Sequence, residues 1–238
     1  MRILAIDAGN TRIKWALHDG QQWLQRGCVQ ENSADLMASL LLEPDQIIIS
    51  NVAGNTVAAD LAKIAPPERI HTIQARNFQC GVSNHYEPAE QLGSDRWAAL
   101  IAAHQSGATS ALVVTAGTAL TVDALHQGEF LGGLIAPGFQ LMLGALAQNT
   151  AQLRTCPGKL ESFPTNTADA IHSGCVLTLS GAIEQMRTIL SQHTQQTVTI
   201  WLNGGDASLL APLLPPSIRV EDNLVLTGLY YIAQEVYA

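Results

Sequence analysis

The pattern of apolar and polar positions predicts a chain that alternates between short strands and helices. Near the N-terminus, apolar runs separated by turn residues predict three strands, with Asp19-Gly20 as a hairpin signal between the second and third. Runs of β-branched residues then alternate with helical segments, one of which is stopped by Pro66-Pro67. The expected elements of this half are strands at 2–8, 12–17, 22–29, 46–50 and 70–73, and helices at 33–42, 55–65 and 95–104.

The second half repeats this order of elements. Placed without gaps, Ile3–Thr11 lies over Ala111–Ala119, where Leu, Ala and Gly coincide and the apolar pattern matches. Two ordinary buried strands could give so short a match, but the repeated order favours a duplication, with domains at 1–106 and 107–238. The expected elements are strands at 111–115, 119–125, 129–132, 197–202 and 218–220, and helices at 139–149, 166–192 (with a bend near Gly181), 207–214 and 223–237.

Charge and composition limit the classes of partner that we expect this protein to bind. Twenty acidic against twelve basic residues give a formal charge of −8, which argues against nucleic acid and anionic membrane surfaces. Only 13% of the residues are charged, and the stretches 97–122 and 130–153 carry no charge. Polar residues and glycine interrupt the first stretch, and glycine, proline and glutamine interrupt the second, so neither predicts a membrane span. Asp7 breaks the N-terminal apolar run too early for a signal peptide. We therefore expect a cytoplasmic protein with no nucleic-acid or membrane partner.

The turn after the first strand, Asp7-Ala8-Gly9-Asn10-Thr11, could bind phosphate. Gly9 allows close approach to the backbone, and the side chains of Asn10 and Thr11 are neutral donors. Asp7 could hold Mg²⁺, which prefers oxygen ligands, and Arg12 and Lys14 would add positive charge. An ordinary hairpin bend has the same composition, so this turn alone does not decide between the two interpretations.

Two further glycine turns follow strands of the second half. Thr115–Ala119 is the counterpart of the first turn, and Asn203-Gly204-Gly205 could admit a flat adenine against bare backbone. Neither matches the P-loop or the Rossmann fingerprint, and plain connecting turns remain an alternative for both.

The segment Gly93-Ser94-Asp95-Arg96 combines a helix start with two opposite charges. Ser94 is a natural N-cap, and Asp95 would lie in the first turn, where the helix dipole favours a carboxylate. In the functional interpretation, Arg96 binds a substrate carboxylate and Asp95 accepts a proton from a hydroxyl that attacks phosphorus. In the alternative, Asp95 only stabilises the helix start.

Together these segments resemble the type III pantothenate kinases, which belong to the superfamily of acetate and sugar kinases, heat-shock chaperone ATPases and actin. The resemblance covers nearly the whole chain, and the order and spacing of its pieces are more specific than any single piece. The segments that carry it are Asp7–Thr11, Tyr86-Glu87-Pro88, Leu92–Trp97, Gly117–Thr121, Gly132–Gly138, Asn166-Thr167 with Ala170-Ile171, and Asn223–Leu229.

The resemblance implies a duplicated actin-like (ribonuclease H-like) fold with mixed sheets flanked by helices and a cleft between the domains. It also implies ATP- and Mg²⁺-dependent phosphorylation of the primary hydroxyl of pantothenate to 4′-phosphopantothenate, the first step of coenzyme A synthesis, by a homodimer. Asp95 would be the catalytic proton acceptor. The implied ATP-binding residues are Asp7, Ala8, Gly9, Asn10, Thr11, Arg12, Ile13, Lys14 and Thr118, and the implied pantothenate-binding residues are Tyr86, Gly93, Ser94, Asp95, Arg96 and Thr167.

One position departs from the family, in which many members have an aspartate that binds K⁺ or a similar monovalent cation. This chain has Thr115 there, so we expect a weak dependence on K⁺ or NH₄⁺. Two other functions remain open: a different small-molecule kinase of the superfamily, and a non-catalytic regulator that keeps the kinase fold.

Overall fold

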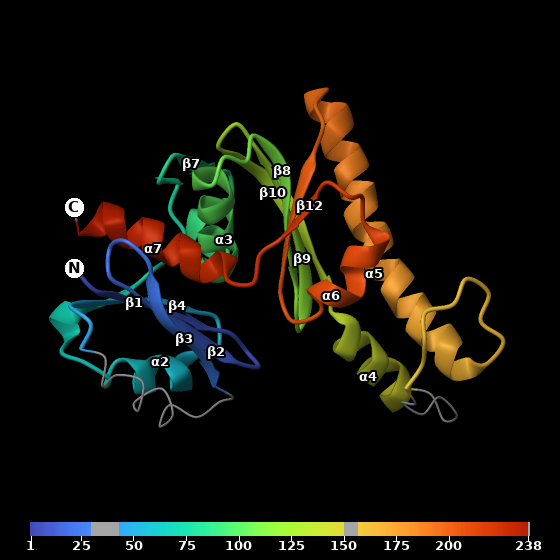
Figure 1. Cartoon of the computed structure of the whole chain (residues 1–238), viewed down its shortest axis with the longest axis horizontal. Helices are drawn as coiled ribbons and strands as arrows, with labels where there is room; N and C mark the ends of the chain where they lie inside the picture. The colour runs from blue at the N-terminus through green and yellow to red at the C-terminus, as the bar shows by residue number, and fades with distance from the viewer. Residues whose placement is uncertain (30–42, 150–156, 238) are drawn as a thin grey trace. The chain divides into compact units, whose positions relative to one another are not determined.

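The computed structural model describes residues 1–29, 43–149 and 157–237, so the predicted helix at 33–42 lies outside the described residues (Figure 1). Contacts within the chain divide it into two units. The first comprises Met1–Ala108, Gly128–Phe130 and Asn223–Ala238, and the second comprises Thr109–Gln127 and Leu131–Asp222.

The first unit contains a mixed five-stranded sheet of order β3-β2-β1-β4-β5. Its central strand β1 pairs antiparallel with β2 and parallel with β4. The predicted strands are confirmed to within two residues at their ends, whereas the helix expected at 55–65 already ends at Leu61. The elements are β1 (Ile3–Ala8), β2 (Ile13–His18), β3 (Trp23–Val29), β4 (Gln46–Asn51), α2 (Asn55–Leu61), the 3₁₀ turn η2 (Pro67–Arg69) and β5 (Ile70–Thr72).

The alternation of side chains across this sheet decides where polar groups can meet. Leu4, Ile6 and Ala8 of β1 pack into one apolar cluster with Leu61 of α2. Because successive residues of a strand point to opposite faces, Asp7 lies on the other face. Two further helices pack against the strands of this sheet. Helix α3 (Ser94–Gln105) packs against β4, and helix α7 (Leu224–Val236) packs against β1, β2 and β4.

Helices α3 and α7 are in close contact within this unit (Figure 1). Gly228 of α7 lies against the backbone of Ala98, and a Cβ at Gly228 would collide with the Ala98 carbonyl. The contacts thus group α7 with the first unit, whereas the sequence placed 223–237 in the second domain. Sequence order suggested that boundary, but packing against α3 and β1 determines the position of α7.

A small strand ladder completes the first unit. It pairs β6 (Phe78–Gln79) antiparallel with β7 (Val82–Asn84), and β7 parallel with Glu129 and Phe130 at the start of β10. The sequence analysis did not predict β6 and β7, which are too short and too polar to give a clear period. The 3₁₀ turn η3 (Ala89–Gln91) leads from this ladder toward α3.

The second unit repeats the sheet topology of the first. Its strands lie in the order β10-β9-β8-β11-β12, which corresponds to the order β3-β2-β1-β4-β5 of the first unit. Strand β8 is antiparallel to β9 and parallel to β11, as β1 is to β2 and β4. The long helix α5 packs against β8, β9, α4 and α6. The elements are β8 (Ser110–Ala116), β9 (Ala119–His126), β10 (Glu129–Pro137), α4 (Phe139–Asn149), α5 (Thr167–Thr194), β11 (Thr199–Asn203), α6 (Ala207–Leu210), η4 (Ala211–Leu213) and β12 (Ile218–Val220).

The predicted elements of this half are largely confirmed, with two differences in extent. The helix expected at 207–214 ends at Leu210 and is followed by the 3₁₀ turn η4. Strand β10 continues to Pro137 instead of ending at 132, because Gly132 takes a φ of 121° without interrupting the strand. Helix α5 runs from Thr167 to Thr194 as one element through Gly181. Within the described part of the chain, no helix combines the length and apolar character needed to cross a membrane.

Candidate functional site

The N-terminal end of α3 forms the first part of the candidate site. Ser94 is the first helical residue and Gly93 the cap, so the predicted Ser94 cap is wrong. The reason is that the Ser94 hydroxyl pairs with the Ser50 hydroxyl of β4, with 2.9 Å between the two buried oxygens. Gly93 suits its position because a Cβ there would lie 2.6 Å from Oδ1 of Asp95. The helix start therefore presents Asp95 and is tied to the end of β4.

Asp7 and Asp95 interact electrostatically within the first unit. Burial and, secondarily, the negative charge of Asp95 raise the pKa of Asp7 to about 7, although the positive charge of Lys14 on the neighbouring strand opposes the shift. Burial also raises the pKa of Asp95, against the opposing effects of the Arg96 backbone N–H and the Arg96 charge. A carboxylate whose pKa is raised toward neutrality is a better proton acceptor near pH 7 than an ordinary exposed one.

The chemistry of Asp7 fits the magnesium ion expected from the sequence. Its Oδ1 is buried and, in the described structure, has no hydrogen-bond partner. Mg²⁺ commonly takes one or two protein carboxylates and fills its remaining positions with water and substrate phosphates. No group of three or more His, Cys, Asp or Glu side chains among the described residues is placed to hold a metal.

Arg96 lies beside two aromatic rings. Its side chain is only 5% exposed, and Nη1 donates a hydrogen bond to the hydroxyl of Tyr86 at 3.3 Å. The guanidinium carbon is 5.6 Å from the ring centre of Tyr86 and 5.9 Å from that of Phe130. A guanidinium held in one orientation can bind a carboxylate through two parallel hydrogen bonds. Phe130 was not predicted from the sequence, because it comes next to Tyr86 only through the pairing of β10 with β7.

The turn between β1 and β2 contributes backbone and exposed polar groups. It is closed by a hydrogen bond from the Gly9 N–H to the Arg12 carbonyl at 3.1 Å. Ala8 and Ile13 are buried in the apolar cluster, so only their backbone atoms are available to a ligand. The exposed residues of the turn are Asn10, Thr11 and Arg12.

Three glycine-containing segments of the second unit meet at the end of β8. The Gly138 N–H donates to the carbonyl of Thr118 at 2.9 Å, and a Cβ at Gly138 would collide with the Gly117 carbonyl. Gly204 has a φ of 108° and lies against the backbone of Ala116 in the same way. The side chain of Thr118 is exposed at the tip of the β8–β9 turn. Gly138 and Gly204 therefore allow these segments to pack closely against one another.

Asn203 fixes the strand ends beside these turns. Its side-chain amide is buried and donates to the Thr115 hydroxyl and to the Val114 carbonyl, each at 3.0 Å. Asn203 is the register partner of Thr115, as Ser50 is of Asp7 in the first unit. Ser50 was not predicted from the sequence, and Asn203 was named there only as part of a glycine turn. Extending the duplication to the crossover strands would have identified both positions.

Thr167 begins α5 and is exposed. The helix start is well defined, because the Asn166 side chain accepts a hydrogen bond from the Asp169 N–H at 3.0 Å. Thr118 and Thr167 belong to the second unit, and the other candidate residues belong to the first.

Comparisons with known proteins identify the family of this chain. A sequence model described as type III pantothenate kinase matches residues 3–188. A type III pantothenate kinase of Nitrosospira multiformis is 45% identical over 242 residues, which cover 98% of this chain and 91% of the relative.

Two solved structures share the fold at low sequence identity. A protein assigned to the Baf family of transcriptional activators, from Campylobacter jejuni, has a TM-score of 0.64 at 20% identity and covers 98% of both chains. A protein assigned as a 2-dehydro-3-deoxygalactonokinase, from Sinorhizobium meliloti, has a TM-score of 0.62 at 15% identity and covers 99% of both chains. These matches confirm the predicted α/β fold with mixed sheets flanked by helices, and the sequence matches show that the chain belongs to the type III pantothenate kinase family.

Proposed function

We propose that this protein transfers the terminal phosphoryl group of ATP to the primary hydroxyl of pantothenate, giving 4′-phosphopantothenate for coenzyme A synthesis. Family membership supports the reaction. The observation that carries the assignment of residues is the group of charged side chains around the start of α3. Asp95 interacts electrostatically with Asp7 of β1 and with the buried Arg96.

Asp95 is the proposed catalytic residue. It would accept the proton of the pantothenate hydroxyl as that oxygen attacks the terminal phosphorus of ATP. Gly93 leaves room for this carboxylate, and Ser94 ties the helix start to β4. Phosphoryl transfer depends mainly on positioning and electrostatic stabilisation, so a rigid helix start supports the assignment.

Arg96 is the proposed binding group for the pantothenate carboxylate, with Tyr86 beside it. Because the guanidinium is buried, its interaction with an anionic group is less weakened by water than at an exposed site. This distinguishes pantothenate from a neutral sugar, which has no carboxylate for Arg96 to bind.

The proposed ATP-binding groups are the turn from Asp7 to Lys14 and the exposed Thr118. Asp7 would hold Mg²⁺, which neutralises phosphate charge when it is bound. Gly204 and Gly205 would lie near the adenine. The space beside the Cα of Gly205 is open, whereas Gly204 packs against the backbone of Ala116.

A weak response to K⁺ or NH₄⁺ is part of the proposal. Thr115 is neutral, and its hydroxyl already accepts a hydrogen bond from Asn203. The cation response is measured as activity in Na⁺, K⁺, NH₄⁺ and a bulky inert cation, and a large rise with K⁺ would overturn this part.

A homodimer is also part of the proposal, with Thr167 reaching the site of the other subunit. Leu177 and Ile189 of α5 are about half exposed, at 50% and 48%, and therefore offer apolar surface for a second copy. Because ATP is the phosphoryl donor, we place the reaction in the cytoplasm.

The test is a coupled ADP-release assay with pantothenate on wild type, Asp95→Asn and Arg96→Ala. Asp95→Asn should lower kcat by about 10²-fold or more while the melting temperature is retained. Arg96→Ala should raise the KM for pantothenate about 10- to 100-fold and leave the KM for ATP nearly unchanged. A near wild-type rate in Asp95→Asn would show that Asp95 is not the proton acceptor. Wild-type protein that binds ATP but phosphorylates nothing indicates a regulator instead.

A further inference from the structure

We infer that Asn84 is a positioning residue for the carboxylate-binding pair Tyr86 and Arg96. The inference rests on the proposed assignment of Tyr86 and Arg96 to pantothenate. All the contacts that carry it lie within the first unit.

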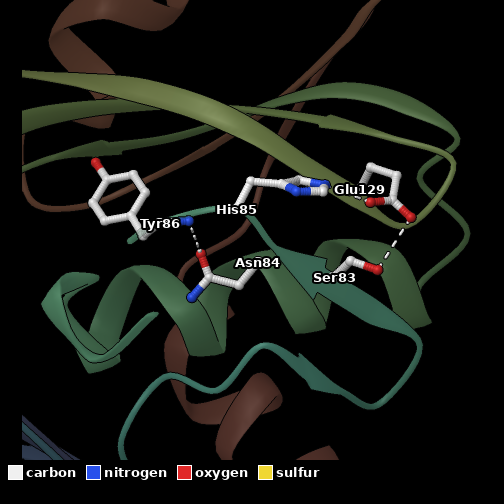
Figure 2. A network of polar contacts seen from close by, with 5 residues as sticks. All are labelled: Ser83, Asn84, His85, Tyr86 and Glu129. Carbon is white, nitrogen blue, oxygen red and sulfur yellow. Dashed lines mark hydrogen bonds and ion pairs between the residues drawn. The ribbon is translucent and has the colours of Figure 1, made fainter. Parts of the chain in front are cut away.

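The Asn84 side chain holds the loop that follows β7 at two points. Its Oδ1 accepts a hydrogen bond from the backbone N–H of Tyr86 at 3.0 Å, as Figure 2 shows. Its Nδ2 donates to the carbonyl of Ala89 at 3.1 Å. Asn84 is 7% exposed, so each backbone group it binds would lose a partner in a largely dry environment if the amide were removed.

The side chains on either side of Asn84 in the sequence bind elsewhere. Ser83 Oγ donates to Oε1 of Glu129 at 3.1 Å, and Nε2 of His85 lies 2.6 Å from Oε2 of Glu129 (Figure 2). The His85 and Glu129 side chains are 59% and 44% exposed, and exposed ion pairs contribute little free energy. The buried amide of Asn84, rather than this surface network, is therefore the main constraint on Tyr86.

The position of Tyr86 in turn orients Arg96. The Tyr86 hydroxyl accepts from Nη1 of Arg96, and the Tyr86 ring lies 5.4 Å from the ring of Phe130, centre to centre. The Arg96 guanidinium carbon is within 6 Å of both ring centres. Phe130 belongs to a paired strand and is fully buried, whereas Tyr86 belongs to the loop that Asn84 closes. Tyr86 is therefore the partner of Arg96 whose position can shift when the amide is lost.

This chain of contacts predicts a defect confined to pantothenate binding. A small shift of Tyr86 would change the direction of the guanidinium fork, and two parallel hydrogen bonds to a carboxylate tolerate little misalignment. ATP is proposed to bind other residues, so the KM for ATP should not change.

The experiment compares Asn84→Ala, Asn84→Ser and Ser83→Ala by steady-state kinetics in both substrates, with melting temperatures recorded. Asn84→Ala should raise the KM for pantothenate about three- to tenfold, with an unchanged KM for ATP. Asn84→Ser should be intermediate, because a serine hydroxyl can accept from the N–H two residues on but is too short to reach Ala89. Ser83→Ala is the matched control on the same strand and should behave as wild type.

A double-mutant cycle separates positioning from simple destabilisation. In a Tyr86→Ala background, Asn84→Ala should cause no further rise in the KM for pantothenate. Additive effects, or equal rises in both KM values, would overturn the inference, and if Asn84→Ala does not fold, the cycle is run with Asn84→Ser. When Arg96→Ala shows its expected defect but Asn84→Ala does not, only the present inference fails. An Arg96→Ala variant with a normal KM for pantothenate overturns the site assignment and this inference together.

Discussion

At the scale of single residues, Asp7 has an unusual environment for a carboxyl group. Its pKa is raised to about 7, chiefly by burial and then by the charge of Asp95. In the unfolded chain the same carboxyl group titrates near 3.8. Between these two values the folded protein retains a proton that the unfolded chain has lost, so the folded state loses stability as the pH rises through this window.

This predicts that the melting temperatures of wild type and Asp7→Asn, measured without nucleotide, differ by an amount that depends on pH. The neutral amide removes the ionisation, so the melting temperature of the variant should rise relative to wild type from about pH 4 to pH 7 and then stay level. Thermal denaturation of both proteins between pH 4 and pH 8 measures it. A difference that does not change with pH would show that the Asp7 carboxyl is not perturbed by folding.

The Ser50–Ser94 hydrogen bond gives a second prediction at this scale. Removing either hydroxyl leaves the other buried without its partner, which should cost about 1 kcal/mol of stability. Because Ser94 precedes Asp95 directly, kcat should fall several-fold as well. The double variant Ser50→Ala/Ser94→Ala should be no worse than either single variant, and full additivity would mean that the two residues act separately.

At the scale of elements, the sequence predicted the buried strands best. Strands such as β1, β4 and β8 are continuous apolar runs between turn residues, so burial and local pattern agree. The short strands β6 and β7 have no such pattern and depend on pairing with each other and with β10. In the candidate site, Asp95 and Arg96 could be proposed from local chemistry, whereas Asn84, whose proposed role depends on its backbone partners, could not.

The contact between α3 and α7 gives the prediction for this scale. Gly228→Ala places a methyl group against the Ala98 carbonyl and should destabilise the protein by about 1–3 kcal/mol or more. Gly181→Ala is the matched control, since this glycine lies in α5 with open space around its Cα. The control should be neutral or up to about 1 kcal/mol more stable, because alanine favours a helix. Thermal melting compares the two variants. Equal stability of both would mean that α3 and α7 can move apart without loss of stability.

At the scale of the whole molecule, sequence order is a poor guide to which residues work together. Helix α7 ends the chain yet packs against α3 and β1, and the start of β10 pairs with β7. The duplicated topology explains part of this, since each unit places a glycine-containing turn at the end of its central strand. The proposed role of Thr167 extends the same idea beyond one chain.

Subunit complementation tests whether a dimer shares its site. In a mixed dimer of Asp95→Asn and Thr167→Ala subunits, sharing would leave one site with an intact Asp95 and an intact Thr167 from the other chain. If mixing randomises the subunits, about a quarter of all sites should be intact, and activity should rise to that level from two weak parents. Asp95→Asn mixed with Arg96→Ala is the matched control, because both residues would belong to the same subunit's part of every site, and no activity should return. Recovery in neither mixture, with exchange verified by mass, would show that each chain uses only its own Thr167 or does not use it at all.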